Sequence, residues 1–354
     1  MSKFFSEKYS KLVPYTPGEQ PKDMEYVKLN TNESPFIPPF SAILAAKREA
    51  ETLNLYPAPE PTELYEKFAA AIGVKPSQLI AVNGSDEVLN FAFAAFCDKD
   101  HPAVFPDITY GFYEVFAKMN CVPYETIPLK DDLTIDPYQY IGTGKTVFIA
   151  NPNAPTGIAL PISDIEIIVA GNPGNVVVID EAYVDFGAES AVSLIDKYPN
   201  LLVTQTFSKS RSMAGARLGF GIASEELIRD LNTIKYSTNP YNVNRLTQAV
   251  GIALLDEADY TSRNCKTIIA NRRGLAHSLE YLGFDVTPSS ANFVFARHPE
   301  IGGEELYLKL KERGVLVRHF SAERIKDYNR ITVGNKEQIE ILIEKIREIL
   351  EEKE

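Results

Sequence analysis

The sequence predicts an α/β protein, with a large domain built on a mainly parallel, mixed sheet flanked by helices and a smaller α+β domain after it. The chain has 354 residues, more than one simple core usually organises. In its first two thirds, short apolar runs rich in β-branched residues alternate with helical segments, a pattern typical of a parallel sheet buried on both faces. After Pro240 the alternation gives way to long helices and a few short strands.

We expect three parts along the chain. Residues 1–35 are polar and punctuated by proline, which predicts an extended arm that packs on the small domain or on a partner subunit. Residues 36–240 are the expected large domain and residues 241–354 the small one. In the large domain, helices are predicted over 41–54, 62–72, 83–96 and 113–119, and strands over 79–82, 103–105, 146–150, 176–179 and 201–204.

The small domain is predicted to hold long helices within 244–282 and short strands over 292–295, 315–317 and 330–333. Its last helix has apolar residues at the spacing of one buried helix face. These residues are Ile339, Leu342, Ile343, Ile346 and Leu350.

Charge and composition argue against several classes of function. A formal net charge of −12 does not suit a protein that binds nucleic acid or an anionic membrane surface. The three cysteines are scattered and the four histidines isolated, so we expect no disulfide framework and no metal site. The first residues lack the apolar core of a signal peptide, and no run approaches the ~20 apolar residues of a membrane span. These features favour a cytoplasmic protein.

The functional prediction depends most on the segment 204–219. An apolar strand leads into a turn of small residues that contains Lys209, and Arg217 follows eight positions later. Because a nearby positive charge disfavours the ammonium form, this lysine is easily deprotonated, and a neutral lysine amine forms Schiff bases with carbonyls. Ser208 and Arg217 could hold a phosphate as charge-assisted donors. The combination suggests pyridoxal 5'-phosphate, whereas an ordinary solvated loop lysine is the plain alternative.

Other polar residues directly follow predicted strands. Asp180 ends one strand, where a buried carboxylate needs a partner such as a protonated pyridine nitrogen, although a helix N-cap is an equally simple role. The turn Gly84-Ser85-Asp86 opens a helix, so its backbone N–H groups could bind phosphate or merely be capped. Asn153 and Lys209 also follow strands. Since sites in parallel sheets form beyond the carboxyl ends of the strands, we expect these residues to share one pocket.

Three further residues are candidates with a structural alternative each. Tyr110 lies in a turn next to a glycine and could stack on a cofactor ring, or it could be a core tyrosine. Arg318 and Arg330 border strands of the small domain and could bind anions from there, or lie on the surface. The segment 142–146 has the end of a nucleotide P-loop, but it lacks the first glycine and precedes a strand, so that function is rejected.

Taken together, the motifs resemble those of the class I and II pyridoxal-phosphate aminotransferases over nearly the whole chain. Within that family the nearest resemblance is to the histidinol-phosphate subfamily, through the segments 14–18, 28–33, 180–186 and 240–244. The motifs shared with the wider family are Tyr56-Pro57, Gly84-Ser85-Asp86-Glu87, residues 106–110, Asn151-Pro152-Asn153-Ala154-Pro155-Thr156-Gly157, residues 178–183, Ser208-Lys209 through Arg217, and residues 330–334.

The resemblance implies a fold like that of aspartate aminotransferase and a role for each matching residue. Lys209 would bind the aldehyde of the cofactor and then carry the proton, and Asp180 would pair with the pyridine nitrogen. Tyr183 would hydrogen-bond the ring hydroxyl, and Tyr110 would stack on the ring. The implied phosphate ligands are Ser85, Ser208 and Arg217, joined by Tyr56 from a partner subunit, and Gly84, Asp86 and Asn153 are counted with the residues that bind the cofactor.

The resemblance also implies residues that bind substrate. Arg330 would hold the substrate carboxylate, and Arg318, with Tyr15 from the partner subunit, would contact a substrate phosphate. Asn32 lies in one of the matching motifs and is counted with them.

The sequence departs from the family pattern in two places. Ala154 stands where the family has an asparagine that contacts the ring hydroxyl, so either Asn153 takes that place or Tyr183 makes the contact alone. Arg211 stands among residues that are small or aromatic in the family, and the sequence assigns it no role.

The implied function is a homodimeric aminotransferase that exchanges an amino group between L-histidinol phosphate and 2-oxoglutarate. An aromatic or other amino acid aminotransferase would share every cofactor motif. A lyase similar to threonine-phosphate decarboxylase would use the same scaffold and arginines. A catalytically silent regulatory module fits poorly, because it would not need both Lys209 and Arg217.

Overall fold

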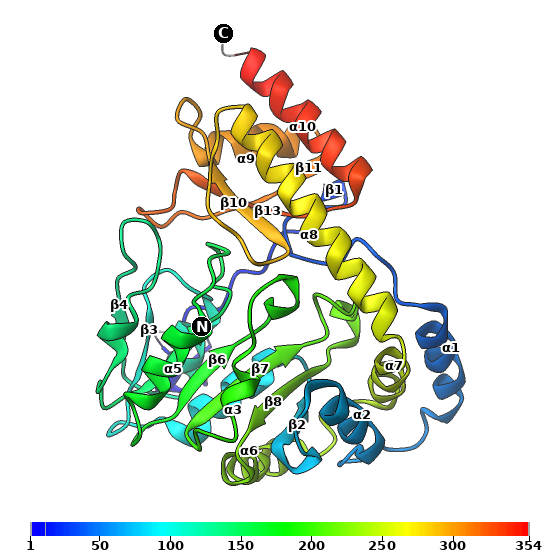
Figure 1. Cartoon of the computed structure of the whole chain (residues 1–354), viewed down its shortest axis with the longest axis vertical. Coiled ribbons are helices and arrows are strands. Elements are labelled where there is room, and N and C mark those ends of the chain that lie inside the picture. Colours follow the sequence, from blue (N-terminus) through cyan, green and yellow to red (C-terminus); the bar gives the residue numbers. More distant parts are fainter. Residues whose placement is uncertain (1, 11, 353–354) are drawn as a thin grey trace.

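The computed structural model describes residues 2–10 and 12–352 and contains two sheets with helices packed on them, plus a short two-stranded pairing (Figure 1). The larger sheet has seven strands in the order β2-β8-β7-β6-β5-β3-β4. β8 runs antiparallel to both of its neighbours, and the other pairs are parallel, so the sheet is mixed and mainly parallel as predicted. Its strands are β2 (Leu79–Val82), β3 (Ala103–Pro106), β4 (Tyr124–Ile127), β5 (Thr146–Ala150), β6 (Val177–Asp180), β7 (Leu201–Thr206) and β8 (Gly219–Ala223).

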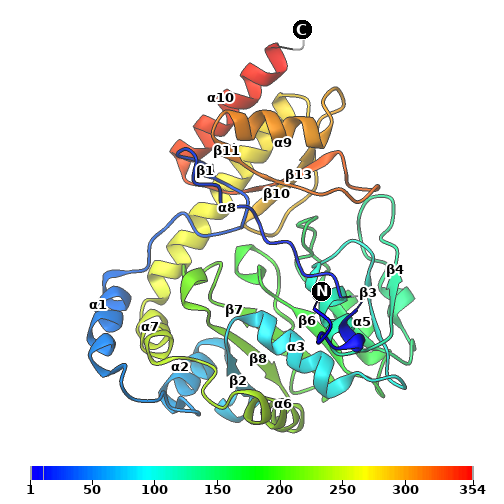
Figure 2. The same cartoon turned by 180° about the vertical axis from the view of Figure 1, so that it is seen from behind.

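Successive residues of these strands point to opposite faces, and both faces are covered. In β6, Val177 and Ile179 join a core with α2, α5 and α7, whereas Val178 joins a core with α3, α4 and α6 on the other face. α5 lies in front of the sheet in Figure 1, and α3 is in front in the reverse view (Figure 2). The helices of this unit are α1 (Phe40–Glu49), α2 (Thr62–Ile72), α3 (Ser85–Phe96), α4 (Phe112–Met119), α5 (Ile162–Ala170), α6 (Glu225–Thr238) and α7 (Arg245–Leu255).

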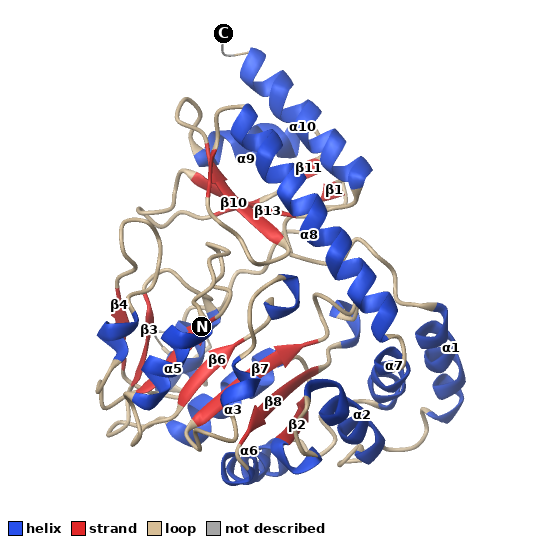
Figure 3. Cartoon of the chain, viewed as in Figure 1, coloured by secondary structure: helices blue, strands red, loops and turns tan. Residues whose placement is uncertain are grey.

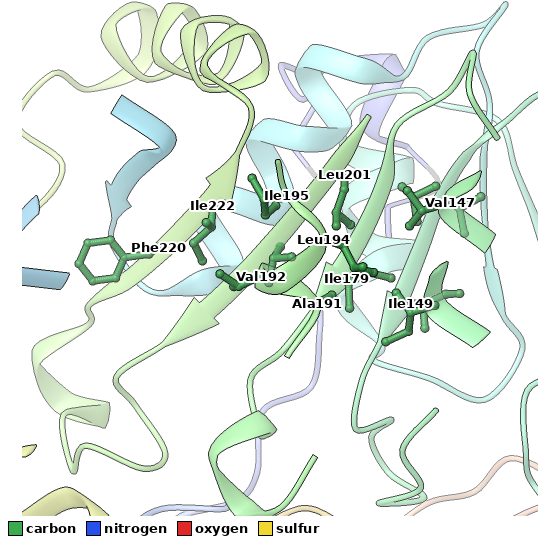
Figure 4. Close-up of a cluster of buried hydrophobic side chains, with 14 of the residues drawn as sticks. Val147, Ile149, Ile179, Ala191, Val192, Leu194, Ile195, Leu201, Phe220 and Ile222 are labelled. Carbon is green, nitrogen blue, oxygen red and sulfur yellow. The ribbon is translucent and has the colours of Figure 1, made fainter. Parts of the chain in front are cut away.

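A 3-10 turn, η6 (Ala191–Leu194), adds to the first of these cores. Figure 4 shows how side chains of β5, β6, β7 and β8 gather with those of η6. Ile179 and Leu201 are fully buried there. Burial on both faces fixes the strands, and therefore the loops that leave their carboxyl ends.

The smaller unit combines helices with an antiparallel sheet of order β12-β13-β10-β9, as the α+β prediction required (Figure 3). Its long helix α8 starts beside α7 and runs along this sheet (Figure 1). The elements are α8 (Ala258–Tyr281), β9 (Asp285–Val286), β10 (Phe293–Arg297), α9 (Gly303–Glu312), β11 (Val315–Leu316), β12 (Arg318–His319), β13 (Tyr328–Thr332) and α10 (Lys336–Glu351).

The N-terminal arm is attached to this smaller unit. Its strand β1 (Val27–Lys28) pairs in parallel with β11, and the Leu29 amide donates to the Leu316 carbonyl at 2.8 Å. In both cartoon views the arm then crosses between the two units (Figure 2). The boundaries at 35/36 and 240/241 stay predictions.

Several elements were missed by the sequence prediction: β1, β4, β8, β9, β12, α5, α6 and α9. The predicted helical region 244–282 is two helices that part between Leu255 and Ala258, and the predicted helix 41–54 ends at Glu49, followed by a 3-10 turn over Ala50–Thr52. None of the helices within residues 2–10 and 12–352 is long and apolar enough to cross a membrane.

Candidate active site

A cavity of about 320 Å³ lies where the carboxyl ends of β5, β6 and β7 meet the smaller unit, within the range of small-molecule sites. Twelve of the predicted site residues line it. They are Tyr15, Asn32, Ser85, Asp86, Tyr110, Asp180, Tyr183, Ser208, Lys209, Arg217, Arg318 and Arg330. The other lining residues include Asn30, Thr31, Phe112, Ala154 and Thr206.

Lys209 enters the cavity from the turn that follows β7. Its Nζ lies 3.5 Å from the Thr31 carbonyl oxygen and 5.8 Å from the centroid of the Tyr183 ring. The turn continues to Met213, whose amide donates back to the Phe207 carbonyl at 3.1 Å. The lysine amine therefore faces the cavity beside a tyrosine and a backbone carbonyl, with no carboxylate paired to it among the described residues.

Asp180 ends β6 and is 4% exposed. The Thr204 hydroxyl donates to its Oδ1 at 2.9 Å and the Tyr113 hydroxyl to its Oδ2 at 3.2 Å. Burial raises the pKa of this carboxyl to about 6, and the two hydroxyl hydrogen bonds oppose that rise. Within the described part of the chain no basic side chain forms an ion pair with Asp180, so a cation entering the cavity would find an uncompensated acid.

The start of α3 and the guanidinium of Arg217 form a cradle for an anion. Gly84 has a φ of +77°, and a Cβ there would collide with the Arg217 guanidinium, so only glycine admits the arginine this closely. Ser85 begins α3, where the backbone N–H groups are free to bind phosphate. Arg217 Nη1 lies 3.4 Å from the Ser208 hydroxyl.

Asp86 and Tyr110 complete this side of the cavity. Asp86 Oδ2 lies 3.2 Å from Arg217 Nη2, and its Oδ1 accepts from the Tyr110 hydroxyl at 2.7 Å. Burial and the charge of Asp86 both raise the pKa of the Tyr110 phenol, which keeps it a neutral hydrogen-bond donor. The Tyr110 ring is thereby fixed in place at the cavity wall.

Tyr183 and Asn32 line the same cavity as Ala154 and are hydrogen-bonded to each other. Asn32 Nδ2 donates to the Tyr183 hydroxyl at 3.0 Å, and Thr332 donates to Asn32 Oδ1 at 3.0 Å. Asn153 does not line the cavity, because its amide contacts the Ile108 carbonyl and the hydroxyls of Thr109 and Thr156. Of the two alternatives left by the sequence, this geometry favours Tyr183, oriented by Asn32.

Two arginines line the side of the cavity formed by the smaller unit. Arg330 lies on β13, and its Nη2 donates to the Asn30 carbonyl at 3.1 Å, while its Nε is buried without a partner in the described residues. Burial lowers the pKa of Arg330. Arg318 donates to the arm carbonyls of Thr16 at 3.0 Å and Pro17 at 3.3 Å. Backbone carbonyls therefore hold both guanidinium groups at the wall of the same cavity.

Tyr15 requires a correction. We expected it from a partner subunit, but it lines the cavity of its own chain, where its ring stacks on Phe112 with centroids 4.2 Å apart. The arm is long enough to fold back over its own site once β1 is anchored. Tyr56, in contrast, lies outside this cavity, is 78% exposed and stacks on Tyr241.

Among the residues of the site that sequence reasoning missed are Phe112, Tyr113 and Thr204. Thr204 is the register partner of Asp180 on the neighbouring strand, so only knowledge of the strand pairing would have found it. Tyr113 reaches Asp180 from the first turn of α4. Its position three residues after Tyr110 gave no signal by itself.

The family follows from comparison of the whole chain with known families. The family model for aminotransferase class I and II matches residues 24–346. The chain belongs to this family. It is therefore an aminotransferase that depends on pyridoxal 5'-phosphate.

Individual relatives agree with the family. The aminotransferase is 48% identical to the histidinol-phosphate aminotransferase of Acetobacter pasteurianus, over 99% of both chains. A solved structure of histidinol-phosphate aminotransferase from Sinorhizobium meliloti, in complex with pyridoxal-5'-phosphate, matches its fold with a TM-score of 0.88 at 22% identity, over 99% of each chain. L-threonine-O-3-phosphate decarboxylase from Porphyromonas gingivalis shares the fold too, with a TM-score of 0.79 at 22% identity, over 92% of this chain and 99% of that one.

The residues of the cavity fit this cofactor. Asp180 is a buried carboxylate with no cationic partner in residues 2–10 and 12–352, which suits a protonated pyridine nitrogen. The cradle formed by the start of α3, Ser208 and Arg217 suits a phosphate. Lys209 lines the same cavity, where its amine could meet the aldehyde of the cofactor.

Proposed function

We propose that this aminotransferase exchanges an amino group between L-histidinol phosphate and 2-oxoglutarate, which gives imidazole acetol phosphate and L-glutamate. The observation that carries the proposal is the position of Arg318 and Arg330 in the cavity of Lys209. Two guanidinium groups in a chain of net charge −12 suit substrates that carry a phosphate or a carboxylate. The name of the Acetobacter pasteurianus relative supports the same amino donor.

Each residue has a distinct task in this proposal. The bound cofactor supplies an electron sink for the negative charge that develops at the substrate carbon. Asp180 would hold the ring nitrogen protonated, and Tyr183, which Asn32 orients, would donate to the ring hydroxyl. Lys209 would accept the proton that leaves the substrate carbon and would donate it again within the same cavity. Arg330 binds a carboxylate and Arg318 a phosphate, while Tyr15 and Phe112 cover the cavity.

Substitution of Arg318 tests the amino donor. In Arg318→Ala, single-turnover kcat/KM for histidinol phosphate should fall by about tenfold to a hundredfold, since a charge-assisted hydrogen bond contributes about 1.5–3 kcal/mol. The half-reaction with glutamate should change much less, because Arg330 would hold that carboxylate. Arg330→Ala should weaken the glutamate and 2-oxoglutarate half instead.

Arg318 also ties down the arm, so this experiment needs a control. Lys311 forms an ion pair with Glu19 of the arm, and Lys311→Ala loosens the arm while the cation of Arg318 remains. A selective loss in Arg318→Ala that Lys311→Ala does not reproduce supports the proposal. Equal losses on both substrates, or none on the phosphate ester, would favour a general amino acid aminotransferase.

Product analysis separates the remaining alternative. The two phosphate-handling arginines would also suit a lyase that acts on a phosphorylated amino acid. Release of CO2 without formation of glutamate would favour that lyase. Formation of glutamate from 2-oxoglutarate, in proportion to the donor consumed, is the result that the proposal requires.

We further propose that the enzyme is a homodimer. Large apolar side chains are exposed around α1 and the segment that follows it, which is typical of an interaction surface. They include Ile37 at 74%, Phe40 at 76%, Leu53 at 56%, Leu55 at 55% and Tyr56 at 78% exposure. In this assembly Tyr56 would contact the cofactor phosphate of the partner.

A cytoplasmic location also stays a prediction, which cell fractionation would test.

A further inference from the structure

Arg211 lies two residues after Lys209 but does not line the cavity. Its side chain is 15% exposed and extends behind the turn that carries the lysine. Arg211 Nη1 donates to Asp185 Oδ2 at 2.8 Å, and the guanidinium lies over the Phe207 ring, 4.6 Å from its centroid. Phe207 is fully buried at the end of β7, so this stacking ties the arginine to the core of the sheet.

Asp185 connects two loops of the active site. The Ser210 hydroxyl and Arg211 Nη1 both donate to its Oδ2, so the two residues that follow Lys209 share one carboxylate. Asp185 belongs to the 3-10 turn η5 (Val184–Phe186), which continues directly from Tyr183. One carboxylate therefore joins the turn of Lys209 to the loop that carries Asp180 and Tyr183.

The neighbouring residues extend this connection. The Ser212 hydroxyl donates to that of Ser34 at 2.9 Å, which links the lysine turn to the arm beside Asn32. Ser212 has a φ of +54°, a conformation that a non-glycine residue adopts only when its surroundings hold it. At the other end of η5, Arg272 of α8 donates to the Phe186 carbonyl at 2.9 Å. Side chains therefore hold the turn of Lys209 in addition to the backbone hydrogen bond from Met213 to Phe207.

We propose that Arg211 and Asp185 are positioning residues that set the place of Lys209 Nζ relative to Tyr183 and Asp180. Neither touches the cavity, so they act through the backbone of the two loops. The proposal rests on the aminotransferase activity but not on the identity of the amino donor, because every donor needs the same proton transfer. A proton carrier displaced by about 1 Å loses on the order of a hundredfold in rate, so a looser turn should lower kcat without weakening substrate binding.

The variants Arg211→Ala, Arg211→Lys and Asp185→Asn test the proposal. Amide hydrogen exchange of the cofactor-free protein should be faster over residues 207–213 in Arg211→Ala, with exchange of β5 and β6 unchanged. In the loaded enzyme kcat should fall by about tenfold or more while the KM for the amino donor stays within about twofold. Arg211→Lys should restore part of kcat, because it keeps the charge but loses the planar fork.

Arg313→Ala is the matched control, since Arg313 also pairs with a carboxylate at 21% side-chain exposure, but in the smaller unit away from the cavity. It should change neither the exchange of residues 207–213 nor kcat. Unchanged exchange in Arg211→Ala, a loss expressed in KM, or no rescue by Arg211→Lys would overturn the proposal. If Arg211→Ala does not fold, Ser210→Ala removes one contact to Asp185 and should give the same effects in weaker form.

The exchange measurement also separates this proposal from the proposed donor. An enzyme that is inactive with histidinol phosphate but active with another amino donor would refute the donor alone. The kcat comparison would then be made with the active donor, and exchange in the cofactor-free protein needs no donor at all. A double variant Arg211→Ala/Asp185→Asn should lose no more kcat than the worse single variant, because both remove the same connection.

Discussion

Asp180 accepts hydrogen bonds from two hydroxyl groups, those of Tyr113 and Thr204. Tyr113 is fully buried, and its hydroxyl stabilises the ionised form of the Asp180 carboxyl. Tyr113→Phe should therefore raise the pKa of Asp180 further and weaken its pairing with the ring nitrogen. We expect the dissociation constant of the cofactor to rise by about tenfold or more, since hydrogen bonds to charged groups contribute about 1.5–3 kcal/mol. Titration of the cofactor-free protein with pyridoxal phosphate measures this.

Tyr140 provides the control for that substitution. It is 1% exposed, and its buried hydroxyl has no hydrogen-bond partner among the described residues. Tyr140→Phe removes the same atom from the same kind of environment and should leave cofactor affinity unchanged. Equal affinities for the two variants would mean that Tyr113 does not support Asp180.

Glu181, next to Asp180, should make stability depend on pH. Burial raises the pKa of the Glu181 carboxyl from 4.5 to about 7, against hydrogen bonds from Ser190, Gln205 and the Ala191 amide. Between these two pH values the folded protein holds a proton that the unfolded chain releases, so the contribution of Glu181 to stability falls as pH rises.

Glu181→Gln keeps the shape of the protonated form and removes this titration. Relative to that variant, the free energy of unfolding of the wild type should fall by on the order of 1 kcal/mol per pH unit from pH 4.5 to 7. Urea unfolding of the cofactor-free proteins across this range is the measurement. Parallel pH profiles would show that Glu181 is already ionised in the fold.

Site residues could be predicted from the sequence where a polar or charged residue stands at the end of an apolar strand. Lys209 and Asp180 could be predicted because Asp180 ends an apolar strand and Lys209 lies in the turn after another, where polar residues meet at a sheet edge. Tyr113 and Thr204 could not, because their role depends on which strand and helix lie beside Asp180. Arg211 was visible as a departure, but its partner Asp185 is 26 residues away along the chain.

At the scale of elements, the loop between β12 and β13 connects the smaller unit to the larger one. Arg324 of this loop donates to Asp107 at 2.9 Å and to the carbonyls of Leu129 at 2.8 Å and Lys130 at 3.0 Å. Asp107 directly follows β3 and leads to Tyr110. Arg324→Ala should let the loop move away from the cavity and raise KM for donor and acceptor alike, by about twofold to tenfold for a contact of about 1 kcal/mol.

A comparable arginine serves as the reference for Arg324. Arg297 pairs with Asp285 at 3.1 Å within the small sheet, so Arg297→Ala removes a similar contact without joining the two units. Its KM values should match those of the wild type. Steady-state kinetics with both substrates distinguishes the loop from Arg318, whose loss should affect the phosphate ester much more than glutamate or 2-oxoglutarate.

Elements with a clear local pattern could be predicted, whereas those shaped by tertiary contact could not. The helix over 62–72 was predicted to the residue, because Gly73 ends it in the left-handed conformation at φ +77°. β8 was missed because its two glycines weaken a strand signal. The structure explains them: a Cβ on Gly219 would collide with the Gly84-Ser85 backbone, and one on Gly221 would crowd Ile80 at 2.9 Å.

At the scale of the whole molecule, the site is proposed to need two chains. Lys209→Ala and Tyr56→Ala should each lower activity as homodimers. In a hybrid dimer of the two, one site carries both substitutions and the other carries neither, so activity should return on mixing the subunits. A mixture of Lys209→Ala with Arg217→Ala is the control, because both residues line the cavity of one chain and no site is then intact. Absence of recovery in verified hybrids with Tyr56→Ala would contradict a shared site.

The layered architecture was predictable from the sequence because burial on both faces leaves continuous apolar strands such as β5 and β6. The path of the arm was not. Its contacts are single side chains, such as Tyr15 on Phe112 and Asn30 on the Glu19 carbonyl, and such contacts leave no periodic pattern in a sequence.

The central claim is that the chemistry of this molecule takes place at Lys209. The most direct test is to load the enzyme with pyridoxal phosphate, reduce it with borohydride, digest it and map the modified lysine by mass spectrometry. The account predicts a stable pyridoxyl label on Lys209, and no label after the same treatment of Lys209→Ala. A label on any other lysine of the wild-type enzyme would contradict it.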